Sequence, residues 1–540
     1  MTILIERPPQ TTRHPHDSGR LEVRGVRHPG FDKILTPGAL RFVGDLHRRF
    51  GGRRSELLAR RQTARVPFDF PADTAAIRRD QTWQVAAPAP GLEDRRCEIT
   101  GPPTRKMTIS ALNSGAKVWM ADFEDATSPT WFNIIDGQRN LYDAIRRQID
   151  FTDETGRQHV LAERTATIMV RPRGWHLPEL HIRVDGEPLG AAFVDFGLFF
   201  FHNAHRLIGA GRGPYFYLPK LESQFEARLW HDVFSWSEQK LDLPRGTIRA
   251  TCLIETFPAA FQMTEILYEL REYSAGLNAG RWDYIFSVIK NHAADESVVL
   301  PDRDKITMTV PFMRAYTELL VRTCHARGAH AIGGMAAFVP SAAYPTVTQR
   351  ALAKTRADKS REAFDGFDGS WVAHPGLVQV CTEVFDRTLR ERPHQIARRW
   401  DDLDVTAAEL NAIPGVPGGV TLEGVRTNIR VSLAYLRAWL QGQGAVAVNH
   451  LMEDAATVEI ARMQLWQWIR HRAKTTTGVE ITRDLVARML TNETVRAIAD
   501  GNGSDDWVVE TAREIVAHGC LDDEFPAFLT AYGYSNYLVG

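Results

Sequence analysis

The sequence predicts an α/β fold, a parallel (β/α)8 TIM barrel with helical segments before and after it. Three observations predict this fold. From about Arg95 onward, short β-prone runs alternate with helical stretches, the pattern of βα units around a parallel sheet. There are eight such runs, enough to close a barrel. The chain has 540 residues, which leaves room for further regions beside a barrel of about 250 residues.

The predicted strands follow one another between residues 97 and 374. They are Cys97–Thr100, Lys117–Asp122, Thr167–Arg171, Tyr215–Leu218, Ile248–Ile254, Tyr273–Ala279, Ala329–Met335 and Ser370–His374. The sixth strand is ambiguous, because Asp283–Ile289 is an alternative β-prone run. Between them, the apolar stretch Ala191–Phe201 predicts a buried helix.

The segment before the barrel, residues 1–94, is rich in Arg, Pro and His. Its helical pattern runs between Gly38 and Arg65 and is interrupted at Gly51-Gly52, because glycine weakens a helix interior. We expect this segment to form a small helical region of its own.

The barrel is assigned to residues 95–400 and a third region to residues 401–540. Five of the six residues from 414 to 419 are Pro or Gly, which stops any regular element. Beyond this break the sequence is largely helical, with apolar residues at a spacing of three to four: Val458, Ala461, Leu465 and Trp468.

Composition excludes several classes of protein. With 44% hydrophobic and 24% charged residues, the chain is neither disordered nor fibrous. The formal net charge is −1, so no overall positive charge attracts nucleic acid or anionic lipid. The most apolar stretch contains Asp195 and Gly197 and falls short of the roughly 18 residues that a membrane span needs. We therefore expect neither a nucleic-acid nor a membrane partner.

Cysteine usage indicates a reducing compartment. The five cysteines are scattered and form no CxxC motif, so neither a disulfide framework nor a zinc ribbon is indicated. The apolar run after Met1 is too short for a signal peptide. A cytoplasmic location is the prediction.

Charged residues stand at the predicted strand ends, where a barrel carries its chemistry. Arg171 directly follows an apolar strand and is suited to binding a carboxylate, although an ion pair at the barrel rim is an equal alternative. Glu255 and Asp283 follow two neighbouring strands. Two carboxylates completed by water and substrate oxygens are typical of a Mg²⁺ site, but their spacing alone is weak evidence.

Two further acidic groups have a functional and a structural interpretation. Asp122, Glu124 and Asp125 follow the second strand and either orient Arg171 or form a solvated loop. Glu453 and Asp454 precede a long amphipathic helix, where acids stabilise a helix N-terminus. The functional alternative is a general base that the C-terminal region presents to the barrel.

Six ordered motifs make the sequence resemble a known family. They are Met120-Ala-Asp-Phe-Glu-Asp-Ala-Thr-Ser-Pro-Thr-Trp131, Arg171-Pro-Arg-Gly-Trp-His176, Tyr215-Phe-Tyr-Leu-Pro-Lys-Leu-Glu-Ser223, Ile254-Glu-Thr-Phe-Pro-Ala-Ala260, Gly276-Leu-Asn-Ala-Gly-Arg-Trp-Asp-Tyr284 and His450-Leu-Met-Glu-Asp-Ala-Ala-Thr457. Together they resemble malate synthase, isoform A, from roughly residue 25 to the end.

The resemblance implies an N-terminal helical clasp, a (β/α)8 barrel and a C-terminal helical plug. It implies an acyltransferase that converts acetyl-CoA, glyoxylate and water to malate and CoA. Glu255 and Asp283 become Mg²⁺ ligands, with Mn²⁺ as an alternative metal, Arg171 the cationic catalytic residue, and Asp454 the base. The resemblance also implies that backbone amides of the turn Gly280, Arg281, Trp282 and Asp283 hold the glyoxylate carboxylate. One position departs from the family pattern, since Tyr273 stands where His is usual.

Two alternatives remain from the sequence. A barrel lyase of the citrate lyase β-subunit or malyl-CoA lyase kind shares the metal, the Arg and the acyl-CoA chemistry, but it is shorter and lacks the C-terminal region with Met452-Glu-Asp454. A non-catalytic barrel scaffold would not need Arg171, Glu255, Asp283 and Asp454 together. The oligomeric state cannot be inferred from the sequence.

Overall fold

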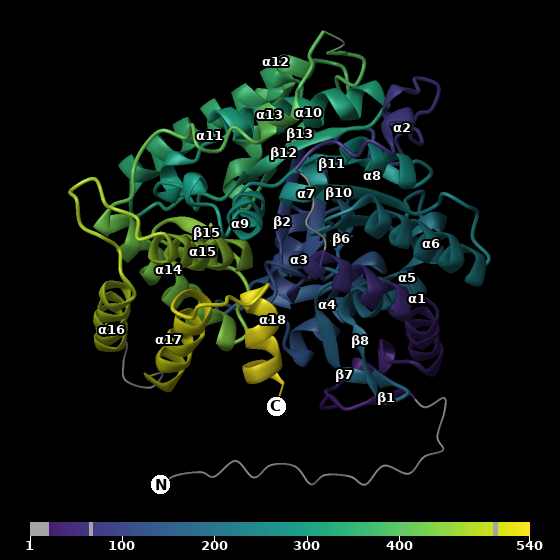
Figure 1. Cartoon of the computed structure of the whole chain (residues 1–540). Helices are drawn as coiled ribbons and strands as arrows, with labels where there is room; N and C mark the ends of the chain where they lie inside the picture. Colours follow the sequence, from purple (N-terminus) through teal and green to yellow (C-terminus); the bar gives the residue numbers. More distant parts are fainter. Residues whose placement is uncertain (1–20, 64–67, 401, 501–505, 540) are drawn as a thin grey trace, which may run out of the picture.

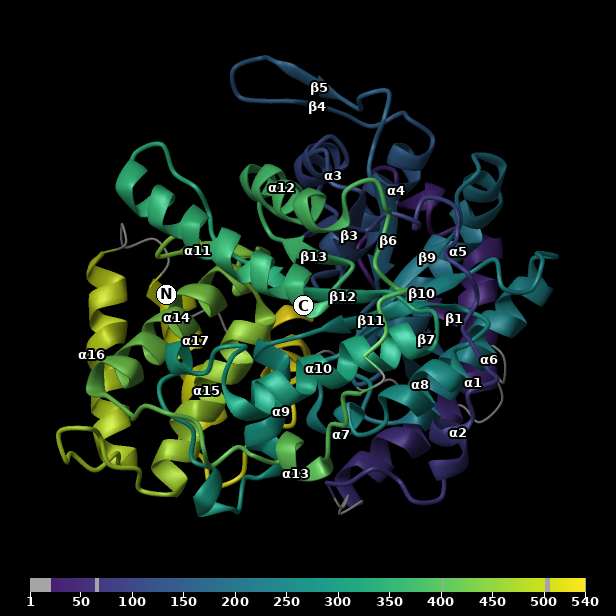
Figure 2. The ribbon, with the colours of Figure 1, turned by 90° about the horizontal axis from the view of Figure 1, so that it is seen from above.

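The computed structural model describes residues 21–63, 68–400, 402–500 and 506–539. All eight predicted strands form and close into a parallel barrel, with the order β10-β11-β12-β13-β2-β3-β6-β9 (Figures 1 and 2). Their bounds are β2 Cys97–Gly101, β3 Val118–Asp122, β6 Thr167–Arg171, β9 Tyr215–Leu218, β10 Arg249–Ile254, β11 Ser274–Ala279, β12 Ala331–Ala336 and β13 Gly369–Val372. The apolar run after Met1, which is predicted to be too short for a signal peptide, lies outside the described residues.

Helices surround the barrel. They are α3 Arg105–Leu112, α4 Trp131–Ile145, α5 Ala191–Gly209, α6 Gln224–Lys240, α7 Phe257–Ala260, α8 Met263–Glu269, α9 Trp282–Asn291, α10 Pro311–Ala326, α11 Pro345–Asp365 and α12 Val378–Leu389. The buried helix predicted at Ala191–Phe201 is confirmed as part of α5. The alternative strand Asp283–Ile289 is helical, and Ser274–Ala279 takes its place in the barrel as β11.

The N-terminal region contains one long helix rather than an interrupted one. Helix α1, Pro37–Thr63, runs through Gly51 and Gly52, so the predicted interruption is wrong. Its buried face packs on α5, where Gly197 allows Val43 and Leu46 to approach closely. Packing against the barrel helices thus outweighs the low helix propensity of the two glycines.

A small antiparallel sheet accompanies α1 in this region. Strand β1, Leu21–Val23, pairs with β7, Pro178–Val184, and β7 pairs with β8, Glu187–Gly190. A second hairpin, β4 Asp150–Thr152 and β5 Gln158–Val160, projects beyond α3 and α4 (Figure 2).

The C-terminal region is helical and lies to one side of the barrel (Figures 1 and 2). After α13, Ala407–Leu410, it contains α14 Leu422–Leu440, the hairpin β14 Val446–Val448 and β15 Leu451–Glu453, α15 Ala455–Arg470, α16 Arg483–Ala499, α17 Asp506–Cys520 and α18 Leu529–Gly533. The predicted helical character beyond the Pro/Gly break is confirmed.

Helix α15 is buried on every side from Ala455 to Trp468, so the prediction of an amphipathic helix is wrong. Its polar side chains hydrogen-bond inside the protein instead. Gln464 Nε2 donates to the Pro301 carbonyl at 2.7 Å, and Gln467 Nε2 donates to the Val298 carbonyl at 2.9 Å. These bonds join the second half of α15 to the segment that follows α9.

Among the described residues, no helix combines the length and the hydropathy needed to cross a membrane.

Candidate active site

The carboxyl ends of the barrel strands open into a cavity of about 1110 Å³. Its walls come from the strand ends, the start of α9, helix α11 and the end of hairpin β14–β15. The predicted site residues that line it are Asp125, Arg171, Glu255, Gly280, Arg281, Trp282, Asp283 and Asp454. Residues that are far apart in the sequence are thus brought to one cavity, including one from the C-terminal region.

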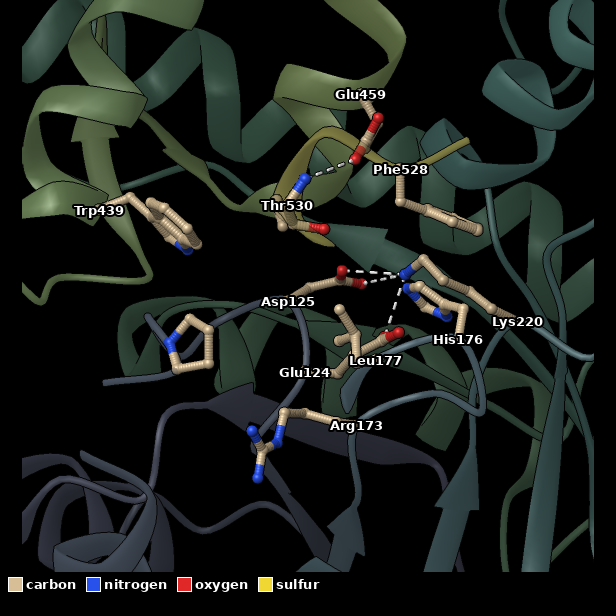
Figure 3. Close-up of a pocket in the computed structure, with 12 residues that line it drawn as sticks. Glu124, Asp125, Arg173, His176, Leu177, Lys220, Trp439, Glu459, Phe528 and Thr530 are labelled. Carbon is tan, nitrogen blue, oxygen red and sulfur yellow. Dashed lines mark hydrogen bonds and ion pairs between the residues drawn. The ribbon is translucent and has the colours of Figure 1, made fainter. Parts of the chain in front are cut away.

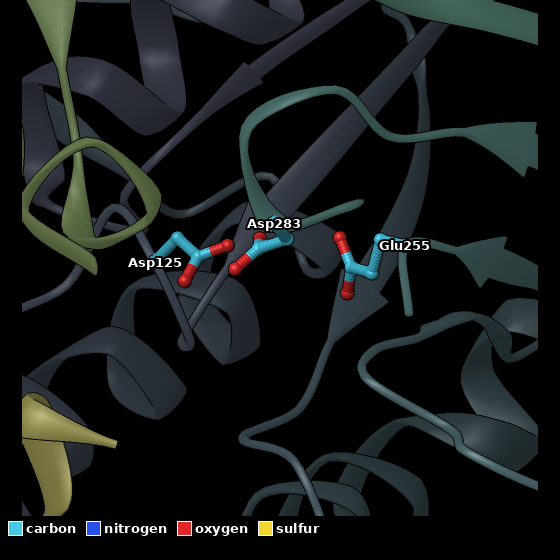
Figure 4. Close-up of side chains that lie close together, drawn as sticks. All are labelled: Asp125, Glu255 and Asp283. Carbon is cyan, nitrogen blue, oxygen red and sulfur yellow. The ribbon is translucent and has the colours of Figure 1, made fainter. Parts of the chain in front are cut away.

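Three buried carboxylates form a cluster on this cavity. Asp125, Glu255 and Asp283 each offer an oxygen, and these oxygens lie within 4.8 Å of one another (Figure 4). Asp125 thus joins the predicted pair of metal ligands. Gly280 makes room for the cluster, because a Cβ at this position would lie 2.6 Å from Cβ of Glu255.

Lys220 lies in the middle of these carboxylates, and the sequence analysis missed it. Its ammonium group lies 2.9 Å from Asp125 Oδ1 and 3.0 Å from Glu124 Oε2 (Figure 3). It also lies 3.1 Å from Asp283 Oδ2. Its backbone N–H donates to Glu255 Oε1 at 2.8 Å. Lys220 also has a φ of 52°, a left-handed conformation that is uncommon for any residue other than glycine.

A signal for Lys220 was present in the sequence, since it stands two residues after the end of β9. A lysine after a strand is usually solvated, and this made it look uninformative. Burial disfavours the charged form, but Asp125, Asp283 and Glu124 outweigh burial and raise the pKa of Lys220 well above its usual value.

Arg171 is oriented by the acidic loop that follows β3. Its Nε and Nη2 donate to the two oxygens of Asp122 at 2.7 and 2.5 Å, and Nη1 lies 3.1 Å from Asp125 Oδ2. Asp122 also accepts the backbone N–H groups of Glu124 and Ala126, at 2.9 and 2.8 Å, so the same carboxylate shapes the loop and holds the guanidinium. The geometry favours the orienting role of this loop over a solvated one.

The carboxylates of the cluster have unequal electrostatic environments. Burial raises the pKa of Asp283 and of Glu255, only partly offset by Lys220. Burial also acts on Asp125, but Lys220 and Arg171 outweigh it and lower the pKa of that carboxyl. In Glu124, burial and the neighbouring Asp125 raise the pKa well above its usual value. The cluster therefore has an excess of negative charge that its two cations only partly neutralise.

Asp454 reaches the cavity from the C-terminal region, directly before α15. Its side chain makes no capping hydrogen bond to that helix, so the structural interpretation as a helix cap is not supported. Its Oδ1 atom is buried and has no hydrogen-bond partner among the residues described. Burial and the nearby Asp125 raise the pKa of Asp454 to about 8, although Arg171 opposes this.

The neighbouring Glu453 differs from Asp454. Glu453 Oε2 accepts the Thr457 hydroxyl at 2.6 Å, and Oε1 lies 3.9 Å from Arg303. Both acids line the cavity, but Glu453 bonds to Thr457 in the first turn of α15, whereas Asp454 Oδ1 has no partner in the described part of the chain. Free carboxylate oxygen and a raised pKa are what a general base needs.

A second, much smaller cavity lies on the far side of Lys220 and Asp125 (Figure 3). Its volume is about 20 Å³, room for about one water molecule. His176 lines it, stacked on Phe528 with ring centroids 3.8 Å apart. Thr530 closes another side through its backbone N–H, which donates to Glu459 Oε1 at 3.3 Å. The C-terminal region thus also forms walls of a cavity beside Glu124, Asp125 and Lys220.

The remaining predicted residues lie at the start of α9. Arg281 Nη2 donates to the Ile306 carbonyl at 2.9 Å, and its guanidinium stacks on Trp282 at 4.3 Å from the ring centroid. Helix α9 begins at the cavity, and its N-cap residue Arg281 makes no side-chain hydrogen bond to the first backbone amides of the helix. Tyr273, the position that departs from the family pattern, is not a lining residue of this cavity, and its hydroxyl donates to Glu238 at 3.1 Å.

Comparison with known proteins identifies the family of this chain. Models of the malate synthase N-terminal domain, TIM barrel domain and C-terminal region match residues 20–69, 167–413 and 419–537. A malate synthase of Streptomyces clavuligerus is 54% identical, covering 94% of this chain and 96% of the relative. The chain belongs to the malate synthase family. A Myxococcus xanthus malate synthase is 52% identical, covering 95% of each chain.

As a member of the malate synthase family, the chain is an enzyme of malate synthesis with the transferase chemistry of that family. Among solved structures, a Haloferax volcanii malate synthase described as a magnesium and glyoxylate complex has 17% identity and a TM-score of 0.43, covering 78% of this chain and 98% of that one. A TM-score this low adds no argument about the ligands of this chain.

Proposed function

We propose that this chain condenses acetyl-CoA with glyoxylate in the large cavity and hydrolyses the resulting malyl thioester to malate and CoA. The observation that carries the proposal is the meeting of Arg171, the carboxylate cluster and Asp454 on one cavity. The three groups supply the parts that the reaction needs: a base, a charge stabiliser and a metal site.

Asp125, Glu255 and Asp283 would hold the metal. The donor set fits Mg²⁺, which prefers carboxylate oxygens and leaves positions for substrate and water, and Mn²⁺ accepts the same oxygens. Asp283 Oδ1 is buried without a partner in the described part of the chain, as expected of an oxygen awaiting a cation. When bound, Mg²⁺ would make the aldehyde of glyoxylate a better electrophile.

Asp454 would remove a proton from the acetyl methyl group. Its unpaired oxygen and raised pKa suit it to accept that proton. Arg171, held by Asp122, would stabilise the negative charge that develops on the thioester oxygen as the proton leaves. The enolate carbon then attacks the aldehyde.

The start of α9 would bind the carboxylate of glyoxylate. Backbone amides from Gly280 to Asp283 lie at a helix N-terminus, where the N–H groups and the helix dipole favour an anion. Basic side chains at the outer wall of the cavity, Arg350, Lys354 and Arg361, complement the phosphates of CoA.

A CoA-release assay tests the proposal. We expect free thiol to appear only when acetyl-CoA, glyoxylate and Mg²⁺ or Mn²⁺ are all present, and malate to form in equal amount. A lyase of the citrate lyase β-subunit or malyl-CoA lyase kind would stop at the thioester. Accumulation of malyl-CoA without thiol release by the unmodified chain would therefore contradict the proposal. The match of residues 419–537 to the malate synthase C-terminal region disfavours the lyase.

We also propose a cytoplasmic location, which the scattered cysteines without a CxxC motif support. A relative from Ricinus communis, 47% identical, is named as glyoxysomal, so family membership does not decide the compartment.

A further inference from the structure

Asn278 is a buried amide on the floor of the large cavity that the proposed chemistry does not yet use. It is fully buried near the end of β11, and its side chain lines the cavity with Arg171, Glu255 and Asp454. Its Nδ2 donates to the Gly333 carbonyl at 3.1 Å. Its Oδ1 has no hydrogen-bond partner within the described ranges. A buried acceptor without a donor is costly, so it points to a ligand.

The orientation of this amide follows from chemistry. A backbone carbonyl only accepts, so the group facing the Gly333 carbonyl must be the NH2 end of Asn278. The oxygen is then the atom left for the cavity. Thr100 also lines the cavity, and its hydroxyl oxygen has no partner among the residues that the structure describes. A hydroxyl can rotate to donate or accept, whereas the Asn278 oxygen only accepts.

The acceptor of this bond is itself held in place. Strand β12 has a bulge between Gly333 and Met335, where its pairing with β13 shifts register. Glu362 Oε1 accepts the Gly334 N–H at 3.1 Å, and the Gly334 carbonyl accepts Lys359 Nζ at 2.6 Å and the Ser370 hydroxyl at 2.9 Å.

A side chain at Gly333 would displace the Glu362 carboxylate, because its Cβ would lie 2.5 Å from Glu362 Oε2. The bulge, together with the ion pair between Lys359 and Glu362 that holds Gly334, therefore fixes the direction of the Asn278 amide. A group held this firmly, with a free acceptor, is suited to positioning a small reactant.

The reactants decide which ligand the acceptor takes. Glyoxylate and the acetyl thioester carry their protons on carbon at the reacting atoms. The malyl thioester has a hydroxyl group, but on the second carbon from the thioester carbonyl, so none of the three offers a hydrogen-bond donor at the carbonyl that is hydrolysed. Water does, and the second half of the reaction consumes one water. We propose that Asn278 positions the water that hydrolyses the malyl thioester, an inference that rests on the proposed function.

The step balances without a further reactant. The water oxygen bonds to the thioester carbonyl carbon, the C–S bond breaks, and CoA leaves as the thiol. One water proton ends on the sulfur, and the other ends on the new carboxyl group, which ionises. Asn278 accepts a hydrogen bond from the water and thereby directs its lone pair; it does not take the proton itself.

The test separates hydrolysis from condensation in the full-length protein. Asn278→Leu removes the acceptor at similar volume, and Asn278→Ala removes it with less crowding. Synthetic malyl-CoA with Mg²⁺ is supplied to each variant, and thiol release is compared with cleavage back to acetyl-CoA and glyoxylate. We expect thiol release to fall about 10-fold or more, the worth of one well-placed hydrogen bond. Deuterium exchange into the acetyl methyl group and the Kd for Mg²⁺ should stay within about threefold.

Asn428→Leu is the matched control. Asn428 is also buried and lines the cavity, but its Nδ2 donates to Gln464 Oε1 at 3.1 Å. This variant should change both steps by the same factor.

The inference is overturned by equal loss of both steps in the Asn278 variants, or by the same split in the Asn428→Leu control. It is also overturned by weakened Mg²⁺ binding in the Asn278 variants, which would indicate that the water lies on the metal. If Asn278→Leu fails to fold, Asn278→Ala still decides the question. Failure of the unmodified chain to release thiol would contradict the proposed function instead.

Discussion

The acids of the barrel and the acid from the C-terminal region have opposite surroundings. Lys220 contacts all three carboxylates of the barrel. Its ammonium group contacts Asp125 and Asp283, and its backbone N–H donates to Glu255. Asp454 has an oxygen that none of the described residues hydrogen-bonds, and its pKa is raised to about 8. The difference teaches that the proposed metal ligands and the proposed base of one cavity differ in their electrostatics because of the charged groups placed beside them.

The largest expected effect comes from removing the proton acceptor. Asp454→Asn is nearly isosteric and should lower exchange of the acetyl methyl protons by about 10²–10⁴-fold, the usual worth of a general base. Mg²⁺ binding, measured by calorimetry, should persist because the metal cluster stays intact. Exchange is followed by NMR of acetyl-CoA in D₂O. Normal exchange in this variant would mean that another residue is the base.

Arg171→Lys tests the cation that serves both groups of acids. Lysine keeps the charge but loses the two-pronged contact with Asp122, so we expect kcat to fall by about 10²–10³-fold, as when a stabilising donor is lost. Arg173→Lys is the control, since Arg173 pairs with Asp195 and Glu179 instead. It should cost stability more than turnover. Equal kcat in Arg171→Lys and the unmodified enzyme would return Arg171 to a structural role.

Lys220→Met would leave the barrel carboxylates without their shared ammonium group. Removing one partner from a buried ion pair usually costs about 3–5 kcal/mol, so the Tm of the metal-free variant should fall by a few degrees. Mg²⁺ should restore most of the loss, because it supplies the missing positive charge. Thermal unfolding with EDTA and with Mg²⁺ measures both effects.

Lys359→Met is the control for Lys220→Met, because Lys359 is a buried lysine paired with Glu362 outside the carboxylate cluster. Its loss of stability should not respond to Mg²⁺. Equal Mg²⁺ rescue in both variants would contradict the assignment of Lys220 as counter-charge of the metal site.

Glu255→Gln and Asp283→Asn test the metal ligands directly. Each should weaken Mg²⁺ binding by about 10–100-fold or more, and glyoxylate binding with it, as removal of supporting groups around a metal already does. Glu453→Gln, next to the base but outside the cluster, should leave the Kd for Mg²⁺ unchanged. Titration calorimetry with Mg²⁺ in the presence of glyoxylate gives the comparison. Unchanged metal dependence in both ligand variants would remove the assignment.

The smallest expected effect is on stability, and its sign differs between the two kinds of acid. Asp454 has a folded-state pKa of about 8, above its usual value of 3.8, so the unfolded chain releases this proton first and stability falls as pH rises from about 4 to 8. Asp454→Asn should remove that loss and raise Tm by about 1–3 °C at pH 8.

Asp125→Asn should instead lower Tm in metal-free buffer. The pKa of Asp125 is lowered by Lys220 and Arg171, so its ionised form stabilises the fold at neutral pH and this stabilisation is lost on acidification. Thermal unfolding of both variants at pH 5 and pH 8 measures the contrast. A Tm change of the same sign in both at pH 8 would contradict it.

Much of the fold could be predicted because it depends on local pattern. Eight β-prone runs with helices between them closed into the barrel in chain order. The errors occurred where tertiary packing outweighs local preference. Two glycines did not interrupt α1, and the polar residues of α15 bond inside the protein rather than facing water.

The candidate site was predictable where residue type announces chemistry, as in Arg171, Glu255 and Asp283. Lys220 and Asn278 gave no such signal, because an isolated lysine or asparagine is usually a surface residue. Their importance depends on what the closed barrel places beside them: three carboxylates for Lys220 and the β12 bulge for Asn278.

Burial of α15 on all sides has a consequence for when the enzyme loses activity on heating. Local opening occurs in segments that have few buried contacts. Helix α15 is enclosed on every face, so it should not open locally. The backbone amides of α15 should therefore exchange with deuterium only when the whole molecule unfolds. Asp454, which directly precedes this helix, would then keep its place until the last cooperative unit melts, well after the ends of α16 and the β4–β5 hairpin have frayed.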